Sequence, residues 1–256
     1  MFLICLILYV FLFFLVYPQK TVTYFYLGLI IFLIIWIIVY LIRNPTLLLA
    51  PYNWWIEWRY PKTVFYNDGE KRNIFPSSKL LENNWEKIRK EMMNLPLDKH
   101  NIGTKYIKEK DSFWEGWNTI ELINFGKINP NLDKCPILKE ILLNDPNITT
   151  AFFSLLAPGK TISSHFGPFK GIIRYHLGLQ VPPQKSGQCY ISVNRETYTW
   201  KEGEGILFDE TYKHFVVNDT EFPRAILFLD VKRPLGFFDT ILNESILLLM
   251  KWSPYG

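Results

Sequence analysis

The sequence predicts a mainly β domain with flanking helices, which follows an apolar N-terminal segment. Two features predict this fold: a series of strand-like segments after residue 148 and almost uninterrupted apolar sequence before residue 43. The strand-like segments are rich in β-branched and aromatic residues, and turns with Gly, Pro or Asn separate them. Short strands repeated at this spacing are typical of a β-sandwich or β-barrel. The predicted strands are 149–156, 172–181, 189–200, 205–208, 214–217 and 224–231.

The N-terminal segment has the composition of a membrane anchor. Residues 1–17 carry no charged side chain, and residues 24–42 form a second apolar run that ends at Arg43. The second run is long enough to cross a hydrocarbon core of roughly 30 Å. We expect residues 1–43 to form a transmembrane two-helix hairpin, or one span with a cleaved or interfacial first segment. More Lys and Arg residues follow the second run than lie between the runs, which places the following domain on the cytosolic side.

Two further segments are expected at the membrane surface. Residues 44–77 form a predicted interfacial linker, because Trp54, Trp55 and Trp58 follow directly after the second apolar run. Trp favours the membrane–water interface, although these rings could also pack on the domain. Residues 236–256 are expected to hold an amphipathic helix that lies at the interface or caps the core, since its apolar run is too short to span.

The remaining residues, 78–235, form the predicted domain. Apolar residues at helical spacing predict a helix that starts at Ser78 and ends before Pro96, and a second helix over residues 136–143. Residues 101–131 show no regular pattern and are expected to be irregular.

Charge and cysteine content limit the partners and the compartment. The net charge of +4 is modest and the basic residues are scattered, which argues against a nucleic-acid partner. Cys5, Cys135 and Cys189 have neither metal-ligand spacing nor an obvious partner. They are expected to be free thiols in a reducing compartment.

Histidines and arginines on the predicted strands indicate a metal and an anion. His165 and His214 lie on or beside predicted strands, and two imidazoles suit iron(II) while leaving open positions. Arg174 shares a strand face with His176, and Arg224 also lies on a strand whose alternate side chains are apolar. A buried Arg is costly without an anion, so an anionic ligand is one partner. The alternative is an ion pair with an internal carboxylate such as Asp209 or Asp219.

These residues lie in or beside three motifs: His165-Phe166-Gly167-Pro168, Arg174-Tyr175-His176-Leu177-Gly178-Leu179 and Phe208-Asp209-Glu210. The motifs resemble the aspartyl/asparaginyl β-hydroxylase family of iron(II)- and 2-oxoglutarate-dependent oxygenases, and the resemblance runs from about residue 80 to residue 235. The resemblance implies a double-stranded β-helix, or jelly roll. It also implies that His165 and His214 bind iron, that Arg224 binds the distal carboxylate of 2-oxoglutarate with Ser154 and Arg174 assisting, and that O2 binds the open position. No catalytic residue beyond the metal centre is implied.

The overall layout is also similar to that of bacterial lipid A 2-hydroxylases, which carry an Asp two residues after the first His. Gly167 stands at that position here. The usual triad of two His and one carboxylate is therefore incomplete, and water could fill the third position. Asp209 could supply a carboxylate, although it lies off the usual motif. His176 is expected to support the metal ligands, to orient the cosubstrate or simply to pack.

The sequence therefore leads to three hypotheses. The first is a membrane-anchored hydroxylase that acts on a peptidyl Asp or Asn side chain. The second is a 2-hydroxylase of a lipid acyl chain, and the third is a catalytically silent module that binds iron or 2-oxoglutarate. The membrane segment favours lipid, whereas Gly167 favours the peptide substrate.

Overall fold

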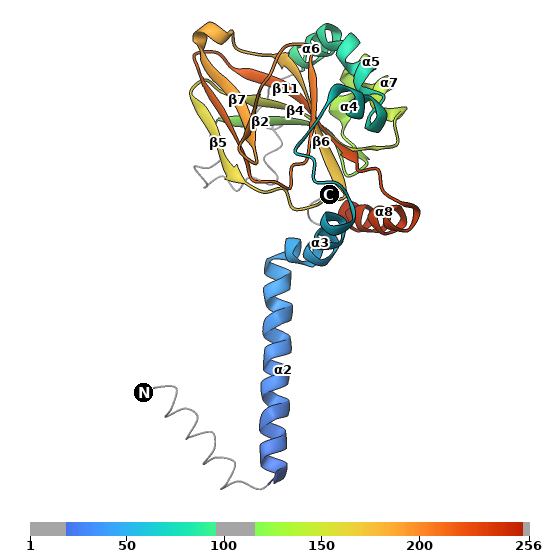
Figure 1. Cartoon of the computed structure of the whole chain (residues 1–256), viewed down its shortest axis with the longest axis vertical. Coiled ribbons are helices and arrows are strands. Elements are labelled where there is room, and N and C mark those ends of the chain that lie inside the picture. The colour runs from blue at the N-terminus through green and yellow to red at the C-terminus, as the bar shows by residue number, and fades with distance from the viewer. Residues whose placement is uncertain (1–18, 96–115, 253–256) are drawn as a thin grey trace. The chain divides into compact units, whose positions relative to one another are not determined.

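The computed structural model describes residues 19–95 and 116–252 (Figure 1). The chain divides into two compact units, Met1–Pro51 and Tyr52–Gly256. The described part of the first unit consists of helix α2 (Gln19–Arg43) and the 3-10 helix η1 (Pro45–Leu49). Within the described residues, no helix combines the length and the hydropathy that a bilayer crossing requires. The transmembrane hairpin expected over residues 1–43 is thus unsupported, and its first run lies outside the described residues.

The second unit contains two antiparallel sheets, so the mainly β prediction is confirmed. Among the described residues, the larger sheet has seven strands and the smaller has four. In spatial order, the larger sheet holds β1 (Phe65–Tyr66), β9 (Gly205–Phe208), β6 (Ile172–Gln180), β11 (Arg224–Lys232), β4 (Ile148–Leu156), β2 (Trp117–Asn124) and β3 (Lys127–Ile128). The smaller holds β5 (Lys160–His165), β10 (His214–Thr220), β7 (Gly187–Val193) and β8 (Glu196–Thr199).

The two faces of the larger sheet pack against different partners, and residue alternation along β11 shows how. Leu227 and Leu229 join a cluster that includes Leu81 and Leu138 of the covering helices. Ile226 and Phe228 point the other way, into a cluster shared with the smaller sheet. The result is a layer of helices, a large sheet and a small sheet (Figure 1). Strand alternation predicted only that Arg224, Ile226 and Phe228 share one face of their strand, and the structure shows that this face lies between the two sheets.

The helices of this unit follow the apolar patterns with one correction. The helix expected from Ser78 is two helices, since Asn84 leaves helical geometry (φ −110°, ψ 13°) and its side chain donates to the Leu80 carbonyl. The helices at 136–143 and 237–252 are confirmed. The helices are α3 (Ala50–Arg59), α4 (Asp68–Ile74), α5 (Ser78–Asn83), α6 (Trp85–Met93), α7 (Pro136–Leu143) and α8 (Phe237–Trp252), with 3-10 helices η3 (Pro130–Lys134) and η4 (Gln184–Ser186).

Two strand predictions were wrong. Of the region expected to be irregular, residues 101–131, the first fifteen residues lie outside the described part of the chain, and the rest contains β2, which pairs with β4 on one side and β3 on the other. The single strand expected over residues 189–200 is the hairpin β7–β8. It reverses at Asn194 (φ 48°) and Arg195 (φ 74°), and two positive φ angles are typical of a tight hairpin turn.

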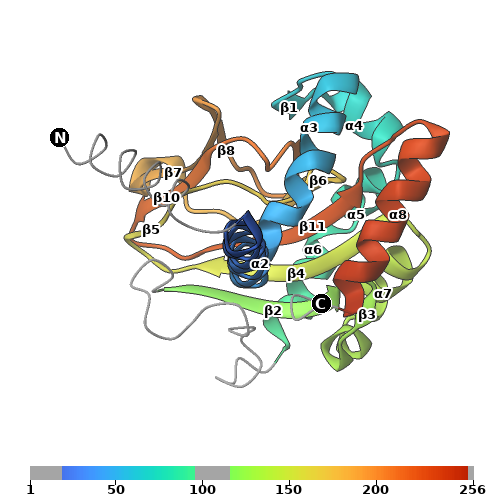
Figure 2. The same ribbon diagram turned by 90° about the horizontal axis from the view of Figure 1, so that it is seen from below.

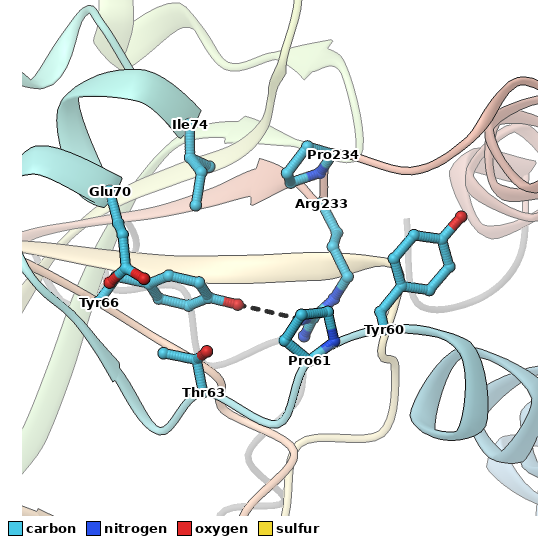
Figure 3. Close-up of a pocket in the computed structure, with 8 residues that line it drawn as sticks. All are labelled: Tyr60, Pro61, Thr63, Tyr66, Glu70, Ile74, Arg233 and Pro234. Carbon is cyan, nitrogen blue, oxygen red and sulfur yellow. Dashed lines mark hydrogen bonds between the residues drawn. The ribbon is translucent and has the colours of Figure 1, made fainter.

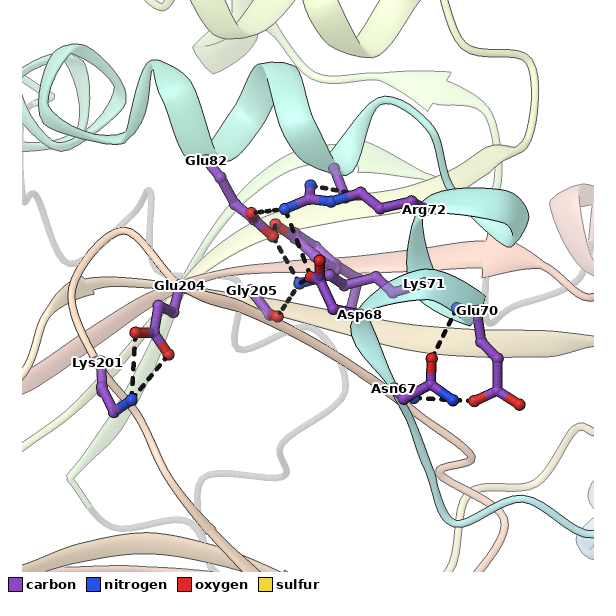
Figure 4. A network of polar contacts seen from close by, with 11 residues as sticks. Asn67, Asp68, Glu70, Lys71, Arg72, Glu82, Lys201, Glu204 and Gly205 are labelled. Carbon is purple, nitrogen blue, oxygen red and sulfur yellow. Dashed lines mark hydrogen bonds and ion pairs between the residues drawn. The ribbon is translucent and has the colours of Figure 1, made fainter.

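A polar network fixes α4 and α5 to the sheet (Figure 4). Asn67 and Glu70 form a reciprocal capping box at the start of α4. Lys71 is buried and donates to the Gly205 carbonyl at 2.7 Å and to Glu82 at 2.9 Å. Glu82 on α5 also pairs with Arg72, so its carboxylate joins the two helices, and Lys71 joins them to strand β9.

Candidate metal and cosubstrate site

The two histidines that the sequence singled out lie side by side. His165 ends β5 and His214 begins β10, and the two are register partners in the smaller sheet. Their ring centroids are 4.1 Å apart. A register irregularity follows His214, so the sheet is distorted next to this pair.

Each imidazole ring contacts the backbone carbonyl of the residue two positions earlier, and this contact favours one tautomer. The Nδ1 atom of His165 lies 2.8 Å from the Ser163 carbonyl, and the Nδ1 atom of His214 lies 2.8 Å from the Tyr212 carbonyl. Because a carbonyl only accepts, both Nδ1 atoms donate and both Nε2 atoms keep a lone pair. Burial lowers the pKa of His165, and burial together with His165 lowers the pKa of His214 to about 3. Both imidazoles are therefore neutral, which is the form that binds a metal.

This donor set fits a metal held by two imidazoles. Within residues 19–95 and 116–252, no cluster of three or more His, Cys, Asp and Glu side chains forms a closed metal site. A pair of neutral imidazoles leaves further coordination positions for a chelating ligand and for water. The two neutral, adjacent imidazoles are therefore candidate ligands for a metal.

The space beside Gly167 is filled by a carboxyl that the sequence did not indicate. A Cβ on Gly167 would lie 2.6 Å from Cγ and Oε1 of Glu210. Glu210 is buried and pairs with Arg174, whose Nε also donates to Asp230 at 3.0 Å. Burial raises the pKa of Glu210 to about 8, with Arg174 opposing the shift and Asp230 adding to it. One guanidinium thus serves two buried carboxyls.

Arg174 is consequently engaged by two internal carboxyl groups. They are not the two that the sequence suggested, because Asp209 pairs with Arg233 instead. The Arg174 guanidinium also lies 4.0 Å from the centroid of the Phe228 ring. Its position between the sheets leaves it next to the His pair, and it is among the charges that lower the pKa of His165.

Arg224 is buried without an ion pair among the described residues. Only 1% of its surface is exposed, and its Nε atom has no hydrogen-bond partner. It lies 4.8 Å from the Trp200 ring centroid, and one terminal nitrogen donates to the Ser154 hydroxyl at 3.4 Å. Burial lowers its pKa to about 10. An unpaired guanidinium in the interior is costly, so this site suits an anionic ligand.

Polar atoms without partners surround Arg224. Both ring nitrogens of His176 and the indole nitrogen of Trp200 are buried and lack a hydrogen-bond partner, and the two rings are 6.1 Å apart. Burial lowers the pKa of His176 well below its usual value, so it is neutral. Trp117 donates to Ser154 at 2.8 Å. The sequence pointed to Glu210 only as part of the motif Phe208-Asp209-Glu210, and it indicated no role in the site for Trp200, whose local pattern is that of a core residue.

Asp209 is used in a different way from a metal ligand. It accepts from Arg233 at 2.6 Å and from the Thr211 hydroxyl at 2.6 Å. Arg233 also donates to the Tyr66 hydroxyl. Arg233 and Tyr66 line a pocket, and neither His165 nor His214 is among the residues that line it (Figure 3). Asp209 therefore joins the end of β9 to the chain after β11.

Comparison with known proteins gives relatives of two kinds. An ornithine lipid ester-linked acyl 2-hydroxylase from Rhizobium tropici is 32% identical over 186 residues, which cover 71% of this chain and 66% of that protein. The human aspartyl/asparaginyl beta-hydroxylase is 33% identical over 185 residues, which cover 69% of this chain but only 23% of that protein. The chain thus spans less than two thirds of the length of these relatives.

A fold comparison adds little. The cupin domain of an XRE-family transcriptional regulator from Enterobacter cloacae aligns with 47% of this chain and all of that domain, at 18% identity and a TM-score of 0.32. A TM-score this low supports no conclusion. The sequence evidence is stronger, because residues 82–234 match the family described as aspartyl/asparaginyl beta-hydroxylase. The chain belongs to the aspartyl/asparaginyl beta-hydroxylase family.

Proposed function

We propose that this chain is a membrane-associated hydroxylase that uses iron(II), 2-oxoglutarate and O2. The observation that carries the proposal is the buried guanidinium of Arg224, which has no carboxylate partner among the described residues and lies between the same sheets as the neutral His pair. A dicarboxylate that chelates the metal at one end would supply the missing anion at the other. Family membership supports the same reading.

The proposed roles follow from these positions. His165 and His214 hold iron through Nε2, and Arg224 binds the distal carboxylate of 2-oxoglutarate with Ser154 beside it. With its cosubstrates bound, the iron centre supplies the oxidising power that converts a C–H bond to C–OH, with succinate and CO2 as co-products. Glu210 and Asp230 hold Arg174 beside the His pair.

The substrate that we propose is the acyl chain of a membrane lipid. It is supported by the relative named as an ornithine lipid acyl 2-hydroxylase and by exposed apolar side chains on α2, from Tyr24 to Ile37. The proposed membrane association rests on such exposed side chains and not on a spanning helix. Free, buried thiols at Cys135 and Cys189 support a reducing, cytosolic setting.

A peptidyl Asp or Asn side chain is the second candidate. One observation favours it: Gly167 lies in an H-x-G-P motif, and the peptide hydroxylases are expected to carry glycine at the same position. Several relatives carry the corresponding names, including the human protein.

The first test is an anaerobic titration of the purified full chain with iron(II) and 2-oxoglutarate. We expect a visible metal-to-ligand charge-transfer absorption, because the cosubstrate chelates an open metal site. His214→Ala should abolish it. Arg224→Met should weaken 2-oxoglutarate binding while iron binding persists, and Arg89→Met, at a half-exposed arginine on α6, is the matched control.

Product analysis then separates the substrates. Succinate formed with lipid extract and a hydroxylated acyl chain would support the first candidate, and a hydroxylated peptide pool the second. If the folded protein shows no absorption and forms no succinate, the chain is a silent module and the proposed activity is wrong.

A further inference from the structure

Helix α8 turns its apolar side chains outward. A surface helix normally buries its apolar face and exposes its polar one. In α8 the residues that face the protein are Asp239, Asn243 and Leu247, spaced four apart, and two of these three are polar. The opposite face is apolar and exposed, with Phe238 at 82%, Leu249 at 71% and its other members Phe237, Ile241, Leu242, Leu248 and Trp252.

Polar contacts join the inner face of α8 to its neighbours, beside the buried side chain of Leu247. Asp239 accepts from Trp55 at 2.8 Å and Tyr60 at 2.6 Å, and it pairs with Arg59 at 3.1 Å. Asn243 is buried beneath the helix and accepts from Tyr52 at 2.8 Å. These contacts supply hydrogen-bond partners for the polar side chains of the inner face. The outer face exposes apolar surface to water, which is unfavourable unless another apolar surface covers it.

Helix α3 lies beside α8 at the same end of the sandwich, and it also exposes apolar side chains to solvent (Figures 1 and 2). Tyr52 and Ile56 point inward, whereas Trp54 and Trp58, one helical turn apart, are 70% and 69% exposed. The exposed apolar side chains of α3 and α8 are called the docking face below.

The docking face adjoins the loop that follows His165. The side chain of Asn53 on α3 donates to the Pro168 carbonyl at 2.7 Å and accepts from the Lys170 amide at 2.9 Å. The Tyr52 ring stacks on Phe169 at 5.3 Å. Helix α3, which carries part of the docking face, therefore contacts the loop that follows the candidate metal ligand His165.

The charges around the docking face suit an anionic surface. Every carboxylate of α3 and α8 already has a basic partner: Asp239 has Arg59, Glu57 has Lys62 and Lys170, and Glu244 has Lys232. Lys127 and Lys251 add positive charge beside Trp252 at the end of α8. Aromatic and aliphatic side chains with a basic rim are typical of a helix that lies in a lipid headgroup layer.

We propose that the docking face is the surface that lies in the lipid bilayer, and that it seats the loop after His165 against the membrane. The inference rests on the membrane association proposed above and adds the side chains that make the contact. The partner that contacts the docking face is a bilayer that contains anionic lipid. The docked surface brings acyl chains to the same end of the sandwich as the metal ligands.

Site-specific fluorescence tests this contact on the full chain without iron or cosubstrate. Cys5 is changed to Ser, and Leu242→Cys or Leu249→Cys is labelled with an environment-sensitive dye, since Cys135 and Cys189 are buried. Lys185→Cys on η4 is the control, because η4 follows the opposite end of β6 from the His165 loop. The probe is a vesicle of phosphatidylcholine and phosphatidylglycerol with nitroxide-labelled acyl chains.

The expected result is blue-shifted emission and quenching at positions 242 and 249, stronger with phosphatidylglycerol, and neither at position 185. Equal quenching at all three positions, or none, overturns the proposal. Protection of position 249 without lipid quenching, together with a doubled mass, would instead identify a second copy as the occupant and would also overturn it.

A kinetic comparison separates docking from chemistry. Leu249→Glu should slow hydroxylation of lipid in vesicles and leave the rate on detergent-dispersed lipid unchanged, whereas Leu143→Glu, at an exposed leucine on α7, should change neither. Quenching without any hydroxylation would retain the docking face and reject the proposed activity. Hydroxylation without quenching would retain the proposed activity and reject the docking face.

Discussion

At the residue scale, the site depends on Gly167, because its lack of a side chain leaves space for the side chain of Glu210. The side chain of Glu210 occupies the volume next to Gly167 and holds Arg174, which is also bonded to Asp230. A carboxylate at position 167 would complete the usual iron triad only if this volume were free. In this chain it is occupied, so the two-His donor set and the Glu210–Arg174 pair belong together.

Gly167→Asp is therefore expected to weaken iron binding, not to strengthen it. The added side chain meets Glu210, and overpacking of a buried site costs about 1–3 kcal/mol. Gly167→Ala should be destabilised for the same reason, whereas Gly69→Ala at the start of α4, where a Cβ meets only an ordinary contact at 3.4 Å, should not. Urea denaturation and iron titration measure the two effects, and tighter iron binding by Gly167→Asp would contradict this account.

At the element scale, buried ion pairs connect strands to the segments that shape the site. Asp209 follows β9 and pairs with Arg233, which follows β11, and both side chains are almost fully buried. Lys170, in the loop after His165, approaches the same carboxylate at 3.4 Å. This pair thus joins three segments that are far apart in the sequence.

Asp209→Asn should destabilise the protein by about 3–5 kcal/mol, because it leaves a buried guanidinium without its anion. Asp133→Asn, in an exposed pair with Lys139, should cost no more than about 1 kcal/mol. Although burial raises the pKa of Asp209, Arg233 and Lys170 lower it below 3.8 overall. The carboxylate therefore stabilises the fold above that pH, and the difference from wild type should narrow as the pH falls below it. A difference in unfolding free energy that does not change with pH would argue against this ion pair.

At the scale of the whole molecule, the core and the candidate site belong entirely to the second unit. The helices cover one face of the larger sheet, and the smaller sheet with the His pair covers the other. The first unit contributes a helix whose described side chains are largely apolar and exposed.

Removal of residues 1–43 should consequently leave the fold intact. We expect cooperative thermal unfolding at the temperature of the full chain and an unchanged iron–2-oxoglutarate absorption. Hydroxylation of vesicle lipid should be slower, because apolar surface that favours the bilayer is lost. Calorimetry and the vesicle assay check these outcomes, and loss of cooperative unfolding would show that the second unit depends on the first.

The sequence by itself determined most of the strands, although it did not predict β5. Strand periodicity and turn residues are local properties, so the positions of β4, β6, β9 and β11 were predicted closely, as was α8. Alternation alone put Ile226 and Phe228 on one face of their strand, and the packing of the two sheets decided that this face is buried between them. The break at Asn84 and the hairpin at Asn194 were missed, because single polar residues there decide the local geometry.

The tertiary structure alone decided which charges meet. Arg174 and Arg224 look alike in sequence, yet one is paired with two carboxyls and the other is buried without an ion pair among the described residues. The outward apolar face of α8 likewise depends on Asp239 and Asn243 bonding to α3, far away in the chain. Partner choice of this kind is set by the packing of distant segments, and local patterns carry no information about it.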